Sequence, residues 1–425
     1  MGFVLVAPDK FKGSLSASGV ADAVAAGFAK ARPNVEIVRT PVADGGDGTL
    51  DAAVAAGFRR VPVTVRGPTG ELVEAAFGVR DGVAVVELAV ASGLVLLPPG
   101  RLFPLTATSF GTGQLVAAAL DAGCDEVVIA AGGSACTDGG AGMLQALGAR
   151  LLAADGRELG PGGAELGHLA QVDLRALHPR LSAVRVILAS DVDNPLLGPQ
   201  GAAAVYGPQK GATPDDVVTL DTALSRWSKL VDPAGTNAPG AGAAGGVGYA
   251  ALSVLRAVRR PGIEVVLDLV GFYEQLPHAR LVITGEGSLD RQTLNGKAPA
   301  GVAAAARAAG VPVVAVCGRC ELDTATLASA GIAQAYPLVD IETDLHRCMS
   351  DPGPLLHKLG ALIAADQGIG LQSCSTACPS SRPPETTSFD GHRAERTILR
   401  HCYAHPVPPI PVEVRGPLLP LSHPG

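Results

Sequence analysis

The stretch Phe3-Val-Leu-Val-Ala-Pro-Asp-Lys-Phe-Lys-Gly-Ser14 joins a short apolar run to a loop of lysine, glycine and serine. An alanine-rich segment over 16–31 follows this loop and has the composition of a helix. An apolar strand, a loop and then a helix form the repeating unit of parallel α/β sheets. The start of the chain therefore predicts a parallel strand at 3–7, with a candidate ligand-binding loop directly after it.

The same unit recurs near both ends of the chain. A second strand is predicted at 35–38, followed by the loop Ala43-Asp-Gly-Gly-Asp-Gly-Thr49 and a helix over 50–56. Three more strands are predicted at 281–284, 311–316 and 332–338, with a helix over 298–309 among them. Together the two ends predict about five strands of one Rossmann or flavodoxin-like, doubly wound sheet.

The middle of the chain has a different pattern. Polar and apolar residues alternate over 61–90, with turn signals at 67–70 and 80–82, which predicts an antiparallel meander. Further strands are predicted at 127–131 and 184–189. We therefore expect a discontinuous Rossmann-like domain at 1–68 and 279–365, a second α/β domain inserted at 69–278, and a small ligand in the cleft between them.

The last part of the chain, 366–425, has no helical or strand periodicity and is rich in proline. Such a composition favours a disordered tail. A zinc site formed by cysteines and histidines of the tail is the alternative; these residues are Cys374, Cys378, His401, Cys402 and His405. A helix over 355–364, just before the tail, is expected to pack on the sheet.

Composition narrows the class of protein. With 425 residues, a net charge of −7 and 4 % aromatic residues, the chain has neither the positive charge nor the stacking side chains of a nucleic-acid binder.

The sequence also bears on localisation. No signal peptide and no apolar segment long enough to cross a bilayer stand out. The eight cysteines have no regular spacing, and Cys317 and Cys320 form a lone CxxC pair. We expect a reduced, cytoplasmic protein without a membrane partner.

Five loops combine glycine with carboxylates or lysines, each after a predicted strand; they lie at 7–14, 43–49, 132–140, 190–194 and 284–290. Ligands of open α/β sheets bind at the carboxyl ends of the strands. Glycine lets backbone N–H groups approach an oxyanion, and carboxylates hold Mg²⁺ or accept a proton. These loops favour a site that handles phosphate over five unrelated tight turns.

Lysine usage supports a phosphate site. Seven of the 33 basic residues are lysines, and four of these lie in or beside glycine loops: Lys10, Lys12, Lys210 and Lys297. A lysine is a compact point charge suited to a phosphoryl group.

Two familiar nucleotide-binding motifs have little or no support. The chain contains no GxxxxGK[ST] loop, and the GxGxxG match at 240–245 follows no predicted strand. A P-loop kinase is therefore excluded, and a dinucleotide site has weak support.

Six blocks in order resemble the bacterial type I glycerate kinase family: Ala7-Pro-Asp-Lys-Phe-Lys-Gly-Ser-Leu-Ser16, Ala43-Asp-Gly-Gly-Asp-Gly-Thr49, Gly132-Gly-Ser-Ala-Cys-Thr-Asp-Gly-Gly-Ala-Gly-Met143, Asp191-Val-Asp-Asn-Pro-Leu196, Gly207-Pro-Gln-Lys-Gly-Ala212 and Ile283-Thr-Gly-Glu-Gly-Ser-Leu-Asp290. The resemblance covers residues 1 to about 365. It implies two α/β domains and ATP-dependent phosphorylation of D-glycerate to 2-phosphoglycerate, with 3-phosphoglycerate as the other product. The family more often has Ser at Lys10, Glu at Asp47 and Asn at Thr137.

Chemistry and resemblance together suggest a role for each candidate residue. We expect Asp191 to accept the hydroxyl proton, with Asp193 as the second choice, and Asp44 and Asp47 to hold Mg²⁺. The residues expected to bind ATP are Lys10, Lys12, Ser14, Gly285, Glu286, Gly287, Asp290 and Lys297. Those expected to bind glycerate are Gly133, Ser134, Asp138 and Lys210.

Two other functions remain open from the sequence: a kinase for another small hydroxy acid, and a non-catalytic protein that binds small phosphorylated acids. Three carboxylates, Asp44, Asp47 and Asp191, argue against the second because they would weaken an anion site. A monomer and a homodimer are both compatible with the sequence.

Overall fold

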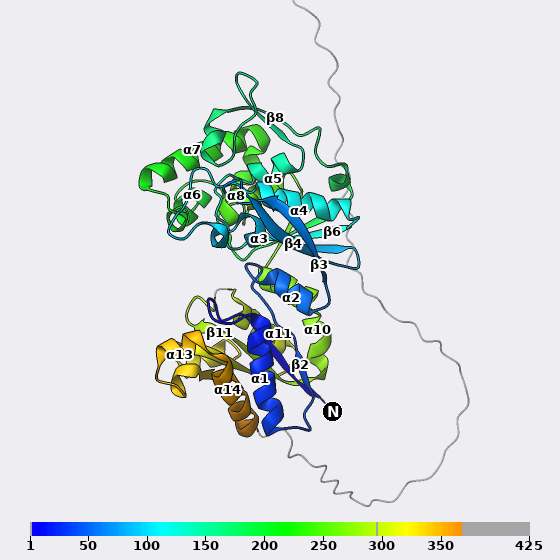
Figure 1. Ribbon diagram of the computed structural model, residues 1–425, viewed down its shortest axis with the longest axis vertical. Coiled ribbons are helices and arrows are strands. Elements are labelled where there is room, and N and C mark those ends of the chain that lie inside the picture. Colours follow the sequence, from blue (N-terminus) through cyan, green and yellow to red (C-terminus); the bar gives the residue numbers. More distant parts are fainter. Residues whose placement is uncertain (1, 295, 368–425) are drawn as a thin grey trace, which may run out of the picture. The chain divides into compact units, whose positions relative to one another are not determined.

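The computed structural model describes residues 2–294 and 296–367 (Figure 1). The predicted tail and its alternative zinc site lie outside the described residues, apart from 366 and 367.

The first sheet is built from both ends of the chain, as predicted. Its strands lie in the order β13 (Gln334–Pro337), β12 (Val313–Cys320), β11 (Ala279–Leu289), β1 (Phe3–Pro8) and β2 (Ile37–Arg39). All neighbouring pairs are parallel. The chain proceeds outward from β1 to β2 on one side and from β11 to β13 on the other. This is the flavodoxin-like strand order, in which ligands bind between β1 and its neighbour at the point where the order reverses.

Helices cover both faces of this sheet, which confirms the doubly wound class. On one face α1 (Ala17–Ala31) lies beside α14 (Gly353–Asp366), with Val24 and Phe28 of α1 and Leu359 of α14 in one buried cluster (Figure 1). On the other face α9 (Gly262–Leu269) and α11 (Ala298–Ala308) share a cluster with β1 and β11. The predicted helix over 355–364 is thus the main part of α14.

The second sheet has six strands, in the order β10 (Val258–Arg260), β9 (Arg185–Ala189), β6 (Glu126–Ala130), β5 (Val83–Glu87), β4 (Leu72–Arg80) and β3 (Arg59–Arg66). The pairs β3–β4 and β4–β5 are antiparallel, which confirms the predicted meander. The strands from β5 to β10 are parallel. A separate hairpin, β7 (Arg150–Ala153) and β8 (Leu169–Asp173), was not predicted.

The remaining helices are α2 (Thr49–Ala55), α3 (Ala89–Ser92), α4 (Phe110–Asp121), α5 (Ala141–Ala146), α6 (Ala202–Tyr206), α7 (Pro214–Val231), α8 (Ala243–Ser253), α10 (Phe272–Gln275), α12 (Thr324–Ser329) and α13 (Leu345–Ser350). Helix α7 begins with a capping box, in which Thr213 and Asp216 exchange hydrogen bonds. Its buried Trp227 donates a hydrogen bond to the Gly139 carbonyl, 3.1 Å away, and so holds the 132–140 loop beneath it.

The borders expected at 68/69 and 278/279 do not coincide with the change from one sheet to the other. Strand β3 lies before residue 68 but pairs with β4, because the turn at 67–70 makes the two strands one hairpin. Helix α9 lies before residue 278 but buries Ile263 and Val266 in the core of the five-stranded sheet. The chain therefore leaves the first sheet earlier than expected and returns to it earlier.

Candidate active site

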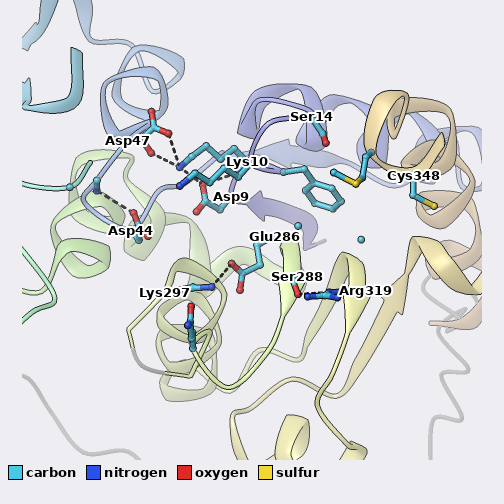
Figure 2. Close-up of a pocket in the computed structure, with 18 of the residues that line it drawn as sticks. Asp9, Lys10, Ser14, Asp44, Asp47, Glu286, Ser288, Lys297, Arg319 and Cys348 are labelled. Carbon is cyan, nitrogen blue, oxygen red and sulfur yellow. Dashed lines mark hydrogen bonds and ion pairs between the residues drawn. The ribbon is translucent and has the colours of Figure 1, made fainter. Parts of the chain in front are cut away.

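Two adjoining cavities lie at the carboxyl ends of the central strands. The larger has a volume of about 760 Å³ and lies at the β1–β11 switch point (Figure 2). The smaller has a volume of about 380 Å³ and is lined mainly by loops that follow β6 and β9. Five residues line both cavities: Lys12, Asp44, Gly46, Gly132 and Gly133. A ligand in one cavity can therefore contact a ligand in the other.

Glycine makes the shared wall possible. A β-carbon placed on Gly132 would lie 2.4 Å from the α-carbon of Gly46, which is closer than such atoms approach in proteins. The 43–49 loop and the 132–140 loop therefore touch backbone to backbone at this point. Any side chain here would force the two loops, and the residues they carry, apart.

The β1 end of the larger cavity carries a lysine held by carboxylates. Lys10 Nζ lies 3.7 Å from Asp9 Oδ1 and 3.8 Å from Asp47 Oδ2, and it also donates to the Asp47 carbonyl (Figure 2). Asp9 is buried, and this burial raises the pKa of its carboxyl to about 7. Lys12 and Ser14, from the same loop, also line the cavity.

The β11 end of the larger cavity carries a second group of charges. Lys297 Nζ lies 3.6 Å from Glu286 Oε2 and 3.9 Å from Asp290 Oδ1. Thr293 donates a hydrogen bond of 2.5 Å to Glu286, whose burial raises the pKa of that carboxyl. Gly287 lines the cavity next to these residues. Lys10, in the loop after β1, and Lys297, at the start of α11, thus line the same cavity, as expected for a site that binds phosphate.

The predicted magnesium ligands, Asp44 and Asp47, both line the larger cavity. Asp44 lines both cavities and its Oδ1 accepts a hydrogen bond from the Gly46 N–H at 3.2 Å. Asp47 lines the larger cavity with a half-exposed side chain. Carboxylate oxygens beside a phosphate site are the donors that Mg²⁺ prefers, since it is bound through one or two carboxylates plus phosphate oxygens. The donor set of Asp44 and Asp47 therefore fits Mg²⁺.

The smaller cavity combines a carboxyl with a buried lysine. Lys210 is 2 % exposed, and its Nζ donates to Ser134 Oγ at 2.8 Å and to the Cys136 carbonyl at 2.5 Å. Its burial lowers the pKa of the ammonium group. Gly133 and Ser134 line the same cavity. A small anion bound here would meet the amino group of Lys210, held in place by two hydrogen bonds, and the Ser134 hydroxyl group.

Asp191 faces this cavity from the loop after β9. Its Oδ1 accepts a hydrogen bond of 2.7 Å from the Gly262 N–H, which fixes the carboxyl in position. Partial burial raises the pKa of Asp191 to about 6, and the nearby charge of Asp44 adds to this effect. A carboxyl with a raised pKa in a cleft is a stronger base than an exposed one, as proton abstraction from a hydroxyl requires.

Four sequence candidates line neither of the two cavities. Asp193 pairs with Arg259 at 2.6 Å, and 78 % of its side chain is exposed. Asp138 is fully buried and accepts hydrogen bonds from the N–H and the hydroxyl of Ser109, at the start of α4. Gly285 packs against β12, and Asp290 stabilises its own turn while pairing with Lys297.

Sequence reasoning missed other residues of the site. Asp9 is the first residue after β1, so the switch-point rule was a sufficient signal for it. Tyr206 lines the smaller cavity and donates a hydrogen bond of 2.6 Å to Asn194, which no motif indicated. A buried carboxyl outside both cavity linings, that of Glu87 at the end of β5, also had no sequence signal: it is 2 % exposed, accepts a hydrogen bond from the Leu50 N–H at 2.9 Å, and burial raises its pKa to about 7.

Comparisons with known proteins agree on one family. The model of the glycerate kinase family matches residues 4–367. The chain is 45 % identical to a glycerate kinase of Bacillus subtilis over 369 residues, which are 85 % of this chain and 97 % of the relative. It is 41 % identical to a glycerate 2-kinase of Escherichia coli, over 87 % of this chain and 99 % of the relative. A crystal structure of a candidate glycerate kinase 2 from Salmonella typhimurium LT2 has a TM-score of 0.76 and 42 % identity, covering 88 % of this chain and all of the other.

The doubly wound sheet, the lysines at its switch point and these relatives define a kinase that transfers phosphate to an alcohol group. Within that class, the match over nearly the whole described chain identifies its group. The chain belongs to the glycerate kinase family.

No helix within 2–294 and 296–367 is long and apolar enough to cross a membrane.

Proposed function

We propose that the protein transfers the γ-phosphoryl group of ATP to the 2-hydroxyl of D-glycerate and releases 2-phosphoglycerate and ADP. The observation that carries this proposal is the pair of cavities with a common wall. The larger one offers Lys10, Lys12 and Lys297 to a polyphosphate, and the smaller one offers Lys210 and Asp191 to a small hydroxy acid. The 2-hydroxyl is preferred because one matched relative is named glycerate 2-kinase.

The residues of the smaller cavity suit the acceptor. Lys210 and Ser134 bind the glycerate carboxylate, while the Asp191 carboxylate accepts the proton of the 2-hydroxyl. The freed oxygen forms a bond to the γ-phosphorus, and the bond from that phosphorus to the bridging oxygen of ADP breaks. The charge that leaves with ADP lies beside Lys10, Lys12 and Lys297 in the larger cavity.

Asp44, at the wall common to both cavities, and Asp47, in the larger cavity, would hold Mg²⁺. When bound there, the ion would neutralise charge on the phosphate oxygens. The two sheets correspond in this proposal to two domains, one carrying the nucleotide and the other the acceptor. The chain crosses between them at 40–58 and at 260–262, beside Asp44 and Asp191.

An ADP-release assay over a panel of hydroxy acids tests the function. We expect Mg²⁺-dependent turnover that is highest with D-glycerate and abolished by EDTA. Phosphorus coupling to C2 in the NMR spectrum of the product would establish 2-phosphoglycerate, whereas coupling to C3 would move the transfer to the other hydroxyl. Folded protein that releases no ADP with any hydroxy acid and any divalent metal would overturn the proposal.

A further inference from the structure

The larger cavity has two chemically different ends. The end at the common wall carries Lys12, Asp44 and Gly132, which also line the smaller cavity. The other end is lined by Phe11, Val339, Leu345, Cys348 and Met349, and none of these five lines the smaller cavity. Figure 2 shows the two ends, with Asp44 and Asp47 on one side of the view and Cys348 on the other.

The charges of the described cavity residues follow the same division. Lys10, which pairs with Asp47, and Lys297, which pairs with Glu286, are the cations that a polyphosphate would meet. At the far end the charged side chain is Arg319, whose guanidinium donates to Ser288 Oγ at 3.2 Å and pairs with Glu321 at 3.0 Å. The far end therefore offers apolar surface and a planar cation rather than a second phosphate site.

Two side chains at this end are unusually exposed for their type. Leu345 is 63 % exposed and Met349 is 67 % exposed, and they lie four residues apart on one side of α13. Cys348 of the same helix is buried, so α13 is anchored through that residue. Exposed apolar side chains at the rim of a deep cavity are typical of a surface that a ligand covers.

We propose that α13, together with Phe11 and Val339, forms the binding surface for the nucleobase of the phosphoryl donor. The inference rests on the proposed use of a nucleotide and adds which residues recognise its base. The orientation follows from the common wall, because the transferred phosphate must lie next to the acceptor in the smaller cavity. The base then occupies the end farthest from that wall, where apolar contact contributes affinity.

The test uses the full chain and two probes, ADP and inorganic tripolyphosphate, each measured by isothermal titration calorimetry. In a double variant, Leu345→Ser with Met349→Ser, we expect Kd for ADP to rise by about tenfold or more, since apolar area covered by the base is lost. Kd for tripolyphosphate is expected to stay within about twofold, because it contacts the lysines alone. Leucine, methionine and serine are all uncharged, so the double variant leaves the electrostatic potential at the phosphate end of the cavity unchanged.

Val218→Ser is the matched control, because Val218 is 65 % exposed on α7 and lines neither cavity among the described residues. Its binding of both probes is expected to equal that of the unmodified chain. Equal weakening of ADP and tripolyphosphate in the double variant, or no weakening of either, would overturn the assignment of the base. Unmodified chain that binds tripolyphosphate but not ADP would overturn it as well. Absence of binding of both probes would instead contradict the proposed nucleotide-dependent function.

Discussion

Asp191 and Asp193 are two residues apart in one loop, yet their surroundings differ. Asp191 is partly buried at the smaller cavity, and Asp193 is an exposed partner of Arg259. The sequence indicated this loop because it follows an apolar strand. It could not indicate which carboxylate faces the cavity, because that depends on Gly262 and Arg259, far along the chain.

This difference gives a direct test of the proton acceptor. Asp191→Asn preserves the size of the side chain and an oxygen that can accept from the Gly262 N–H, but it removes the base. We expect kcat to fall about a hundredfold or more, with ADP affinity unchanged. Asp193→Asn is the control, with kcat expected within about twofold because its side chain is exposed. Comparable losses in both variants would place the base elsewhere.

The raised pKa of the buried Glu87 carboxyl predicts how stability changes with pH. Its pKa is raised to about 7 in the folded chain, against 4.5 for an ordinary glutamate, so the folded state holds the proton more tightly. The stability that depends on this proton is complete below pH 4.5 and is lost as pH rises through about 7. Glu87→Gln cannot ionise. Relative to the unmodified chain it should therefore gain up to about 3 kcal/mol in free energy of unfolding between pH 4 and pH 8.

Thermal or urea unfolding across that pH range measures the difference. Glu36→Gln, at an exposed position, is the control for the substitution of glutamate by glutamine itself. A difference for Glu87→Gln that is constant with pH would show that the Glu87 carboxyl ionises in the folded chain as easily as in the unfolded one.

At the scale of elements, the helices α1 and α14 approach each other unusually closely. A β-carbon on Gly360 of α14 would lie 2.2 Å from the Val24 carbonyl oxygen, and one on Gly27 of α1 would lie 1.8 Å from the His357 carbonyl oxygen. The sequence predicted both helices from their apolar residues. It gave no signal for the contact between them, because a glycine inside a helix has several possible causes.

Gly360→Ala tests this contact. Alanine favours a helix by about 1 kcal/mol over glycine, but overpacking of a close contact costs about 1–3 kcal/mol. We therefore expect Gly360→Ala to lower the melting temperature, although alanine is the better helix former. Gly353→Ala, in the same helix with no atom within 4 Å of the added carbon, should be neutral or stabilising. A stabilised Gly360→Ala would mean that the helices can separate without cost.

At the scale of the whole molecule, the sequence predicted two α/β layers and the strands of the central sheet. The predicted borders at 68/69 and 278/279 differ from the change of sheet because local patterns do not say with which sheet a strand pairs. Strand β3 alternates polar and apolar residues and was separated from β4 by a border placed inside their common turn. The two cavities lie where segments from both sheets meet, so they depend on contacts that no local pattern contains.

A chain that ends at Gln367 tests whether the described residues are sufficient for activity. The family model ends at this residue, and α14 keeps its contact of 3.3 Å between Asp366 and Tyr336. Both cavities are lined by residues up to Met349, so kcat is expected within about twofold of the full chain. Circular dichroism controls for folding. A folded but inactive shortened chain would show that residues after 367 contribute to the reaction.

The pairing of β1 with β11 has a consequence for biosynthesis. Residues 3–8 are translated before every other strand of the two sheets, but their partner at 279–285 is translated only after every strand of the six-stranded sheet. The strands from β3 to β10 occupy the continuous stretch 59–260 and can assemble while translation proceeds. Strand β1 and the loop that carries Lys10 and Lys12 therefore lack their pairing with β11 until the strands of the six-stranded sheet have been translated. The phosphate site is therefore among the last features that a newly made molecule acquires.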